Sequence, residues 1–178
     1  MILGLVLAGG KSTRFGSDKA LARLDGHTLL SQAVDTISGW ADYVVVAGRE
    51  TAPAPTMPDW PHADMGPLGG IASALHYARD ESYASVLSMG VDTFALPDNL
   101  PELLSSPPCY VESQPIIGHW PATDSTIASL EAILEGKGRH SMIAFAEAIG
   151  ARGVKLAAKP ANINTPADLL AAEKHHGI

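Results

Sequence analysis

The sequence contains one cysteine, Cys109, and comparatively few cationic residues. An intramolecular disulfide needs two cysteines and a Cys-rich zinc site needs more, so both are excluded. Lys and Arg number 12 against 19 Asp and Glu, which gives a formal net charge of −7. Proteins that bind nucleic acids gain affinity by neutralising phosphates with basic residues, so this charge balance argues against a nucleic-acid partner.

Long hydrophobic runs, internal repeats and low-complexity tracts are also missing from the 178 residues. No stretch approaches the roughly 20 apolar residues that span a bilayer, so we expect no membrane partner. The apolar start, residues 1–8, has no basic residue ahead of it and leads directly into a Gly-rich turn. This pattern favours a buried first strand over a signal peptide, and with the single cysteine it predicts a cytoplasmic protein.

Apolar residues make up 46 % of the chain and follow two alternating patterns. Strand-length runs are expected at residues 2–8, 43–48, 84–90, 109–113, 116–120 and 153–157, with an antiparallel pair or edge in the second half. Segments of helical spacing lie at residues 30–37, 68–75, 127–134 and 142–149, and a capped helix start lies at 165–168. The alternation predicts an α/β fold with a mostly parallel sheet, helices on both faces and a single domain over residues 1–178.

A Gly-rich segment follows the first predicted strand, from Leu7 to Ala20. Small residues there let the backbone turn its N–H groups toward one space, which is how polyphosphates are held without side chains. Four cations and one acid give the segment up to residue 23 a local charge of about +3, which suits an anionic ligand. The sequence matches neither G-x-x-x-x-G-K-[ST] nor G-x-G-x-x-G, so a P-loop NTPase and a Rossmann dehydrogenase are excluded. A tight turn with surface lysines remains the alternative.

A carboxylate, Asp92, comes directly after the predicted strand at residues 84–90. Ligands of open parallel sheets bind beyond the carboxyl ends of the strands, so Asp92 is expected near the Gly-rich segment. Mg²⁺ prefers oxygen ligands and keeps several waters, so one carboxylate together with substrate phosphates can hold it. The alternative is that Asp92 only caps the following turn.

Five prolines interrupt regular structure between residues 53 and 67. Such a segment is either a surface connection or a loop that frames a ligand site, and the two interpretations are compatible. In the second interpretation, the loop brings Asp64 and Gly66 to the start of the next helix.

The order of the motifs resembles the molybdenum cofactor guanylyltransferases, which are MobA-like nucleotidyltransferases. The resemblance begins with Leu7-Ala8-Gly9-Gly10-x-Ser12-x-Arg14-Phe15-Gly16-x-Asp18-Lys19-Ala20 and covers nearly the whole chain. It continues through the segments 66–70, Asp92 with 96–97, 114–118 and 162–169. The first and last of these motifs are long enough to be informative by themselves.

This resemblance implies transfer of GMP from GTP to molybdopterin that carries molybdenum, with Mg²⁺ as the cofactor. The products would be the guanine dinucleotide form of the molybdenum cofactor and pyrophosphate. The implied fold is a three-layer α/β/α, Rossmann-like nucleotidyltransferase domain. The implied protein partners are one that delivers molybdopterin and the molybdoenzymes that receive the product.

The resemblance also assigns roles to individual residues. The guanine and ribose pocket would be lined by the backbone of Leu7, Ala8, Gly9 and Gly10. Lys19 would lie at the nucleotide phosphates with Arg14 supporting the triphosphate, and Asp92 would hold Mg²⁺. Asp64 would help to recognise the base or the ribose. The side chains expected toward the pterin substrate or the metal are Asn162 and Asn164.

The sequence departs from the family pattern in three places. Phe15 stands where the family commonly has Met, the Cys and Pro that usually flank the metal-binding Asp are absent, and the segment between Cys109 and Gln114 is short. Two alternative functions stay open, a cytidylyltransferase for the same cofactor and a nucleotide-binding regulator without catalysis. The glycine pair Gly9-Gly10 favours guanine over cytosine, and the presence of both Lys19 and Asp92 favours catalysis.

Overall fold

A seven-stranded sheet forms the centre of the computed structural model, which describes residues 1–10 and 16–176. In spatial order the strands are β10 (Arg152–Val154), β8 (Cys109–Val111), β9 (Gln114–Pro121), β6 (Ser85–Gly90), β1 (Ile2–Leu7), β4 (Tyr43–Ala47) and β5 (Thr56–Met57). Only β9 runs antiparallel to its neighbours in this sheet. The predicted α/β fold with a mostly parallel sheet is therefore confirmed.

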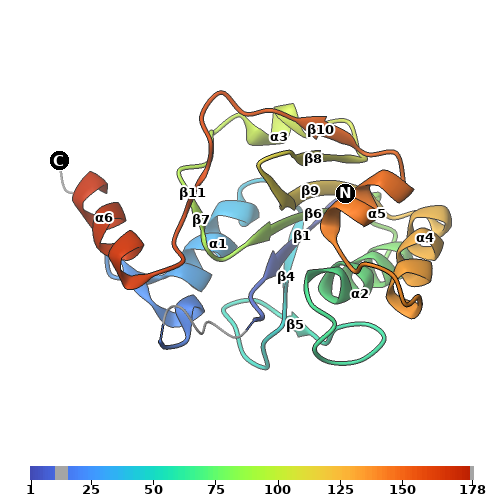
Figure 1. Cartoon of the computed structure of the whole chain (residues 1–178), viewed down its shortest axis with the longest axis horizontal. Helices are drawn as coiled ribbons and strands as arrows, with labels where there is room; N and C mark the ends of the chain where they lie inside the picture. The colour runs from blue at the N-terminus through green and yellow to red at the C-terminus, as the bar shows by residue number, and fades with distance from the viewer. Residues whose placement is uncertain (11–15, 177–178) are drawn as a thin grey trace.

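Helices cover both faces of the sheet, as Figure 1 shows. One face carries α2 (Pro67–Asp80), α4 (Asp124–Glu135) and α5 (Met142–Ala148), and the other carries α1 (Leu29–Ser38) and the short α3 (Leu100–Leu103). Leu3, Leu5 and Leu7 of β1 belong to the cluster under α2, whereas Val6 belongs to the cluster under α1. Burial on both faces explains why the central strands are almost continuously apolar.

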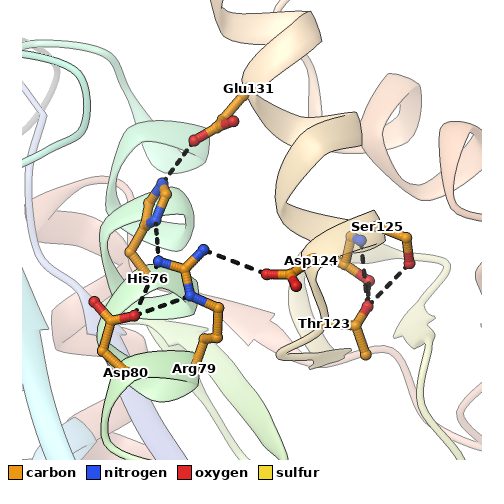
Figure 2. Close-up of polar contacts among 8 residues, drawn as sticks. His76, Arg79, Asp80, Thr123, Asp124, Ser125 and Glu131 are labelled. Atoms are coloured by element: carbon orange, nitrogen blue, oxygen red, sulfur yellow. Dashed lines mark hydrogen bonds and ion pairs between the residues drawn. The ribbon is translucent and has the colours of Figure 1, made fainter.

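Polar contacts join α2 to α4 on the face of the sheet that these two helices cover, as Figure 2 shows. His76 Nε2 lies 2.9 Å from a Glu131 carboxylate oxygen. Arg79 pairs with Asp80 at 2.9 Å and reaches Asp124 at 3.4 Å. These side chains are partly or largely exposed, so each ion pair contributes little to stability. The contact between the helices depends mainly on the apolar cluster beneath these side chains.

Two small sheets extend the fold at the side where α6 (Pro166–His176) lies, on the left of Figure 1. One pairs β7 (Thr93–Phe94) with β11 (Ala161–Asn162), and the other pairs β2 (Arg23–Leu24) with β3 (His27–Thr28), just after the short 3-10 helix η1 (Lys19–Leu21). A separate apolar cluster of Leu24, Leu29, Ile163 and Ala172 packs α6 against these segments.

The predicted start of α6 has the expected capping arrangement. The Asp168 N–H donates to Thr165 Oγ1 at 3.2 Å, and the Thr165 N–H donates to Asp168 Oδ2 at 2.8 Å. Such reciprocal hydrogen bonds satisfy backbone donors that a helix leaves free at its first turn.

No helix within residues 1–10 and 16–176 is both long and apolar enough to cross a membrane.

Candidate nucleotide-binding site

Three strands end side by side at one edge of the sheet. Leu7, the last residue of β1, is in register with Ala47 at the end of β4 and with Gly90 at the end of β6. The loops that follow these strands therefore meet at the carboxyl edge, where ligands of open α/β sheets bind. This is the arrangement expected from the sequence for the Gly-rich segment and Asp92.

Two pockets open at this edge. The larger, with a volume of about 730 Å³, includes Leu7, Gly9, Gly10 and Asp64 in its wall. The smaller, of about 450 Å³, includes Ala8, Gly9, Gly10 and the segment 16–18. All four residues predicted to line a nucleoside pocket with their backbone thus border one or both of these pockets, and Asp64 borders the larger.

Close contact between two glycines shapes the floor that the pockets share. Gly48 has a φ of +87°, and a Cβ added to it would lie 2.5 Å from both the Cα and the N of Gly9. No side chain fits between these two backbone segments, so the loops after β1 and β4 touch directly. The close approach leaves the surface of the loop bare, which lets a flat ligand lie against the backbone.

Lys19, Asp92 and Asn164 meet beyond the end of β6 although they are far apart in the sequence. None of the three borders either pocket, but Lys19 directly follows Asp18, which borders the smaller one. Lys19 Nζ lies 3.1 Å from Asp92 Oδ2 and 3.5 Å from Asn164 Oδ1. The Lys19 and Asp92 side chains are 18 % and 27 % exposed, so both remain accessible to a ligand. The structure thereby brings together one predicted phosphate-binding residue, the predicted metal ligand and one of the two predicted asparagines.

The Asn164 loop is held by Asp168 on the first turn of α6. Asp168 Oδ2 accepts hydrogen bonds from the backbone N–H groups of Asn164, at 2.9 Å, and Thr165, at 2.8 Å. The hydrogen bond from the Asn164 N–H, with those from Thr165, lowers the pKa of Asp168 below its ordinary value of 3.8. The carboxylate is therefore charged at neutral pH and fixes the backbone that presents Asn164.

The second predicted asparagine, Asn162, makes a different contact. Its Oδ1 accepts a hydrogen bond from Gln114 Nε2, and Gln114 Oε1 accepts one from Thr93 Oγ1 at 2.8 Å. Gln114 and Thr93 are buried, so their polar groups need these partners. The network joins β9 to the β7–β11 pair and so supports the loop that carries Asp92.

The residues around Asp92 suit a magnesium ion that also binds substrate. Gly90 lacks a Cβ, and one built there would lie 2.9 Å from Asp92 Oδ1, so the bare backbone leaves room for that oxygen. Within the part of the chain that the structure describes, no three or more His, Cys, Asp or Glu residues are grouped as a metal site. A single carboxylate with a nearby amide oxygen fits Mg²⁺, which usually retains waters and substrate phosphates.

Arg49 and Asp59 both border the larger pocket, although neither was expected there from the sequence. Arg49 forms two hydrogen bonds with Asp18, Nη1 to Oδ1 at 2.9 Å and Nη2 to Oδ2 at 2.7 Å. These bonds lower the pKa of Asp18 and raise that of Arg49. The position of Arg49 directly beyond the end of a predicted strand was the available signal, because the carboxyl end of such a strand faces the ligand.

Asp59 lies in the Pro-rich segment together with Asp64, which is exposed. The Asp59 Oδ2 accepts a hydrogen bond from the Met65 N–H at 3.1 Å. Burial raises the pKa of Asp59 above its ordinary value of 3.8, and the nearby Asp64 charge acts in the same direction. A partly buried carboxylate with a raised pKa in a pocket wall is a common feature of functional sites. Its short distance from the predicted helix start was the only sequence signal for Asp59.

The cationic character expected for this edge depends partly on residues that the structure does not describe. Arg14, predicted to support the triphosphate, and Lys11 lie outside the described residues. Lys19 and Arg49 each pair with a carboxylate, so their charges are locally balanced.

The fold and this edge define an α/β domain whose loops gather at the carboxyl ends of parallel strands, where domains of this class bind their ligands. The family described as the MobA-like NTP transferase domain matches residues 4–148. The molybdenum cofactor guanylyltransferase of Acidiphilium cryptum is 36 % identical over 183 residues, covering 95 % of this chain and 92 % of that protein. The enzyme of the same name from Rhodobacter capsulatus is 31 % identical over 187 residues, covering 97 % and 95 %. The chain therefore belongs to the MobA-like NTP transferase family and is a nucleotidyltransferase.

Solved structures share the fold at lower sequence identity. Molybdopterin-guanine dinucleotide biosynthesis protein A from Archaeoglobus fulgidus matches over 99 % of both chains with a TM-score of 0.75 and 20 % identity. The 2-C-methyl-D-erythritol 4-phosphate cytidylyltransferase from Thermus thermophilus matches over 98 % of both chains with a TM-score of 0.58 and 16 % identity. Proteins named for different nucleotides thus share this architecture, and the fold alone does not select the base.

Proposed function

We propose that this protein transfers GMP from GTP to the molybdenum–molybdopterin cofactor and releases pyrophosphate. The observation that carries the proposal is the Lys19–Asp92 pair, 3.1 Å apart, at the same carboxyl edge of the sheet as the two pockets with a glycine floor. Relatives that are named molybdenum cofactor guanylyltransferase and aligned over 95 % or more of the chain support the choice of guanine and of this acceptor. In this proposal residues 1–178 act as one nucleotidyltransferase domain.

The proposed binding mode follows the walls of the two pockets. The guanine and ribose lie against the backbone of Leu7, Ala8, Gly9 and Gly10, with Asp64 at the rim of the larger pocket. Backbone N–H groups of a glycine loop can donate to ligand oxygens without competition from side chains. Lys19 lies at the phosphates, and Arg14 is assigned to the triphosphate from its place in the motif.

The reaction is a displacement at the α-phosphorus of GTP. A terminal phosphate oxygen of the molybdopterin attacks, a new P–O bond forms, and the bond from the α-phosphorus to the α,β-bridging oxygen breaks. Pyrophosphate leaves with the electron pair of that bond. The attacking phosphate is already ionised near neutral pH, so the enzyme needs neither a covalent nucleophile nor a strong base. Its contribution is to position both substrates and to stabilise charge.

Four side chains contribute to this positioning and charge stabilisation. The Lys19 ammonium donates hydrogen bonds to phosphate oxygens and stabilises the charge that develops on the leaving pyrophosphate. Asp92 and the neighbouring Asn164 oxygen would hold Mg²⁺, which when bound supplies positive charge to the phosphate oxygens. Asn162 and Asn164 lie on the side assigned to the pterin substrate, in the segment that precedes α6.

Further parts of the proposal concern the setting of the reaction. We place the protein in the cytoplasm, where a protein partner delivers molybdopterin and molybdoenzymes receive the product. A cytidylyltransferase for the same cofactor is the alternative enzyme. A nucleotide-binding regulator is the alternative without catalysis, and it would not require a metal-binding carboxylate beside the lysine.

The first experiment is calorimetric binding of GTP, CTP and ATP to the purified protein, with and without Mg²⁺. We expect a clear preference for GTP that Mg²⁺ strengthens. A preference for CTP would favour the cytidylyltransferase, and binding of none of the three would refute the proposed function.

The second experiment measures pyrophosphate release with GTP and molybdopterin for the wild type and Asp92→Ala. We expect the variant to retain part of the GTP affinity and to lose turnover by at least about a hundredfold, because oriented charge stabilisation is a large part of such catalysis. Asp124→Ala, a change to an exposed carboxylate on α4, is the control and should turn over normally. Normal turnover by Asp92→Ala would show that the metal assignment is wrong.

A further inference from the structure

The side chain of Arg49 lies at the junction of the two pockets. Four residues border both of them, namely Gly9, Gly10, Gly48 and Arg49. Three of the four are glycines, so Arg49 supplies the only side chain that both pockets share among the described residues. The larger pocket reaches toward β5 and the start of α2, whereas the smaller reaches toward the segment 16–18 that leads to Lys19.

Arg49 is connected to Lys19 through one carboxylate. Asp18 Oδ1 accepts hydrogen bonds from Arg49 Nη1 at 2.9 Å and from the Ala20 N–H at 3.2 Å, so the same oxygen binds the arginine and caps η1. Asp18 Oδ2 accepts the second guanidinium hydrogen bond at 2.7 Å. Lys19 is the next residue after Asp18 and the first of η1. The direction in which Lys19 leaves the backbone is therefore fixed by the carboxylate that Arg49 holds.

The charge of Arg49 is largely neutralised within the protein. Two parallel hydrogen bonds to one carboxylate are the strongest geometry available to a guanidinium, and they leave the pair nearly neutral. A neutral pair attracts an anionic substrate much less than a free arginine does. The contribution of Arg49 to phosphate binding is therefore expected to be geometric rather than a direct charge effect.

The burial of Arg49 leaves one of its donors without a hydrogen-bond partner in the described part of the chain. Its side chain is only 17 % exposed, and its Nε is sealed from solvent with no hydrogen-bond partner among residues 1–10 and 16–176. A buried donor without a partner costs free energy, and a sequence selected only for stability avoids it. Local conflicts of this kind are expected at functional sites.

We propose that Arg49 is a positioning residue for the nucleotidyl transfer, which holds Lys19 at the phosphates through Asp18. The inference rests on the proposed function, because it takes Lys19 as the phosphate-binding residue. In the proposed arrangement the Arg49–Asp18 pair joins the loop after β4, which borders the nucleoside, to the start of η1, which carries the ammonium. The distance between the nucleoside and phosphate subsites is thereby fixed by an ion pair and not by the chain connection alone.

The test is a set of GTP affinities in the presence of Mg²⁺. Arg49→Gln and Asp18→Asn should each weaken GTP binding by about tenfold, which is about 1.4 kcal/mol. The double variant should be no weaker than either single variant, because both remove the same connection. Arg49→Lys should recover little of the loss, since an ammonium cannot form the paired hydrogen bonds of a guanidinium.

The decisive comparison repeats Arg49→Gln in a Lys19→Met background. If Arg49 acts through Lys19, the change has almost no further effect on GTP affinity once the ammonium is gone. A merely structural role would instead lower the melting temperature and the affinity in both backgrounds. Arg79→Gln, which removes a partly exposed arginine paired with carboxylates away from the pockets, is the matched control and should bind GTP normally.

The outcomes separate this inference from the proposed function. If the wild type binds no GTP, the proposed function fails and the inference fails with it. If the wild type binds GTP and Arg49→Gln weakens it equally in both backgrounds, only the positioning role is overturned. The positioning role is also overturned if Arg49→Gln binds GTP as tightly as the wild type, or if Arg49→Lys restores full affinity.

Discussion

Replacing Gly48 by alanine tests whether the contact between the loops after β1 and β4 shapes the nucleotide site. The new Cβ would lie 2.5 Å from the Cα and the N of Gly9, which are backbone atoms that cannot rotate away. Gly48 also has a φ of +87°, a conformation that costs a residue with a side chain about 1–2 kcal/mol. The steric conflict adds about 1–3 kcal/mol, as overpacking of a tight site does.

The expected total is therefore a loss of about 2–5 kcal/mol in the free energy of unfolding. For a domain of this size each kcal/mol lowers the melting temperature by about 2–4 °C, so the drop should be about 4–20 °C. Gly9 must move to relieve the conflict, and it borders both pockets. We therefore expect GTP binding to weaken by about tenfold or more, which is at least about 1.4 kcal/mol.

Gly26→Ala is the matched control for this prediction. Gly26 has a similar φ of +81°, but a Cβ there would meet nothing within 4 Å. This variant should show only the backbone cost, a drop of about 2–8 °C, with unchanged GTP affinity. Thermal unfolding and calorimetry on the two variants measure both effects. Equal destabilisation and equal GTP affinity of the two variants would refute the reasoning, because the contact with Gly9 would then have no consequence.

Two further predictions concern the pH dependence of stability, measured by urea unfolding from acid to neutral pH. Burial raises the pKa of Asp59, so the stability associated with its protonated form is lost as pH rises through that raised value. Asp59→Asn should therefore be more stable than the wild type at pH 7, with the difference closing below the ordinary value of 3.8; a constant difference would contradict this. The pH dependence of stability due to Asp168 has the opposite sign. Hydrogen bonds from Asn164 and Thr165 lower its pKa, so the stability it contributes is lost as pH falls through that lowered value. Asp168→Asn should be less stable than the wild type at neutral pH and should approach it in acid, and equal stability at pH 7 would show that the negative charge of Asp168 contributes nothing to the capping.

The strands of the central sheet could be predicted because burial on two faces leaves a strong local pattern. Residues 2–8 and 43–48 were expected as strands, and the structure has Ile2–Leu7 and Tyr43–Ala47. The predicted strand boundaries in the second half of the chain were less accurate. Strands expected at 109–113 and 116–120 are Cys109–Val111 and Gln114–Pro121, joined by a two-residue turn. Such boundaries depend on which strand supplies the hydrogen-bond partners, and that information is not local.

The candidate site was predictable only in part. The glycine loop, Lys19 and Asp92 stood out because each follows a predicted strand or belongs to a long motif. Asp59 did not, because nothing in a Pro-rich segment distinguishes a partly buried carboxylate from an exposed one, such as Asp64, although both border the larger pocket. Asn162 and Asn164 belong to one motif, yet one pairs with Gln114 and the other with Lys19.

Local sequence is sufficient for the α/β class, for the parallel edge at which the loops gather, and for the chemistry of the residues that gather there. These features follow from apolar periodicity, glycine placement and residue type, all of which are readable within a few residues of chain. The three-dimensional fold is needed to know that Lys19 meets Asp92, 73 residues away, and that Arg49 holds Asp18, 31 residues away. Those pairings depend on the order and register of β1, β4 and β6, because the sheet places the ends of distant strands within reach of one another.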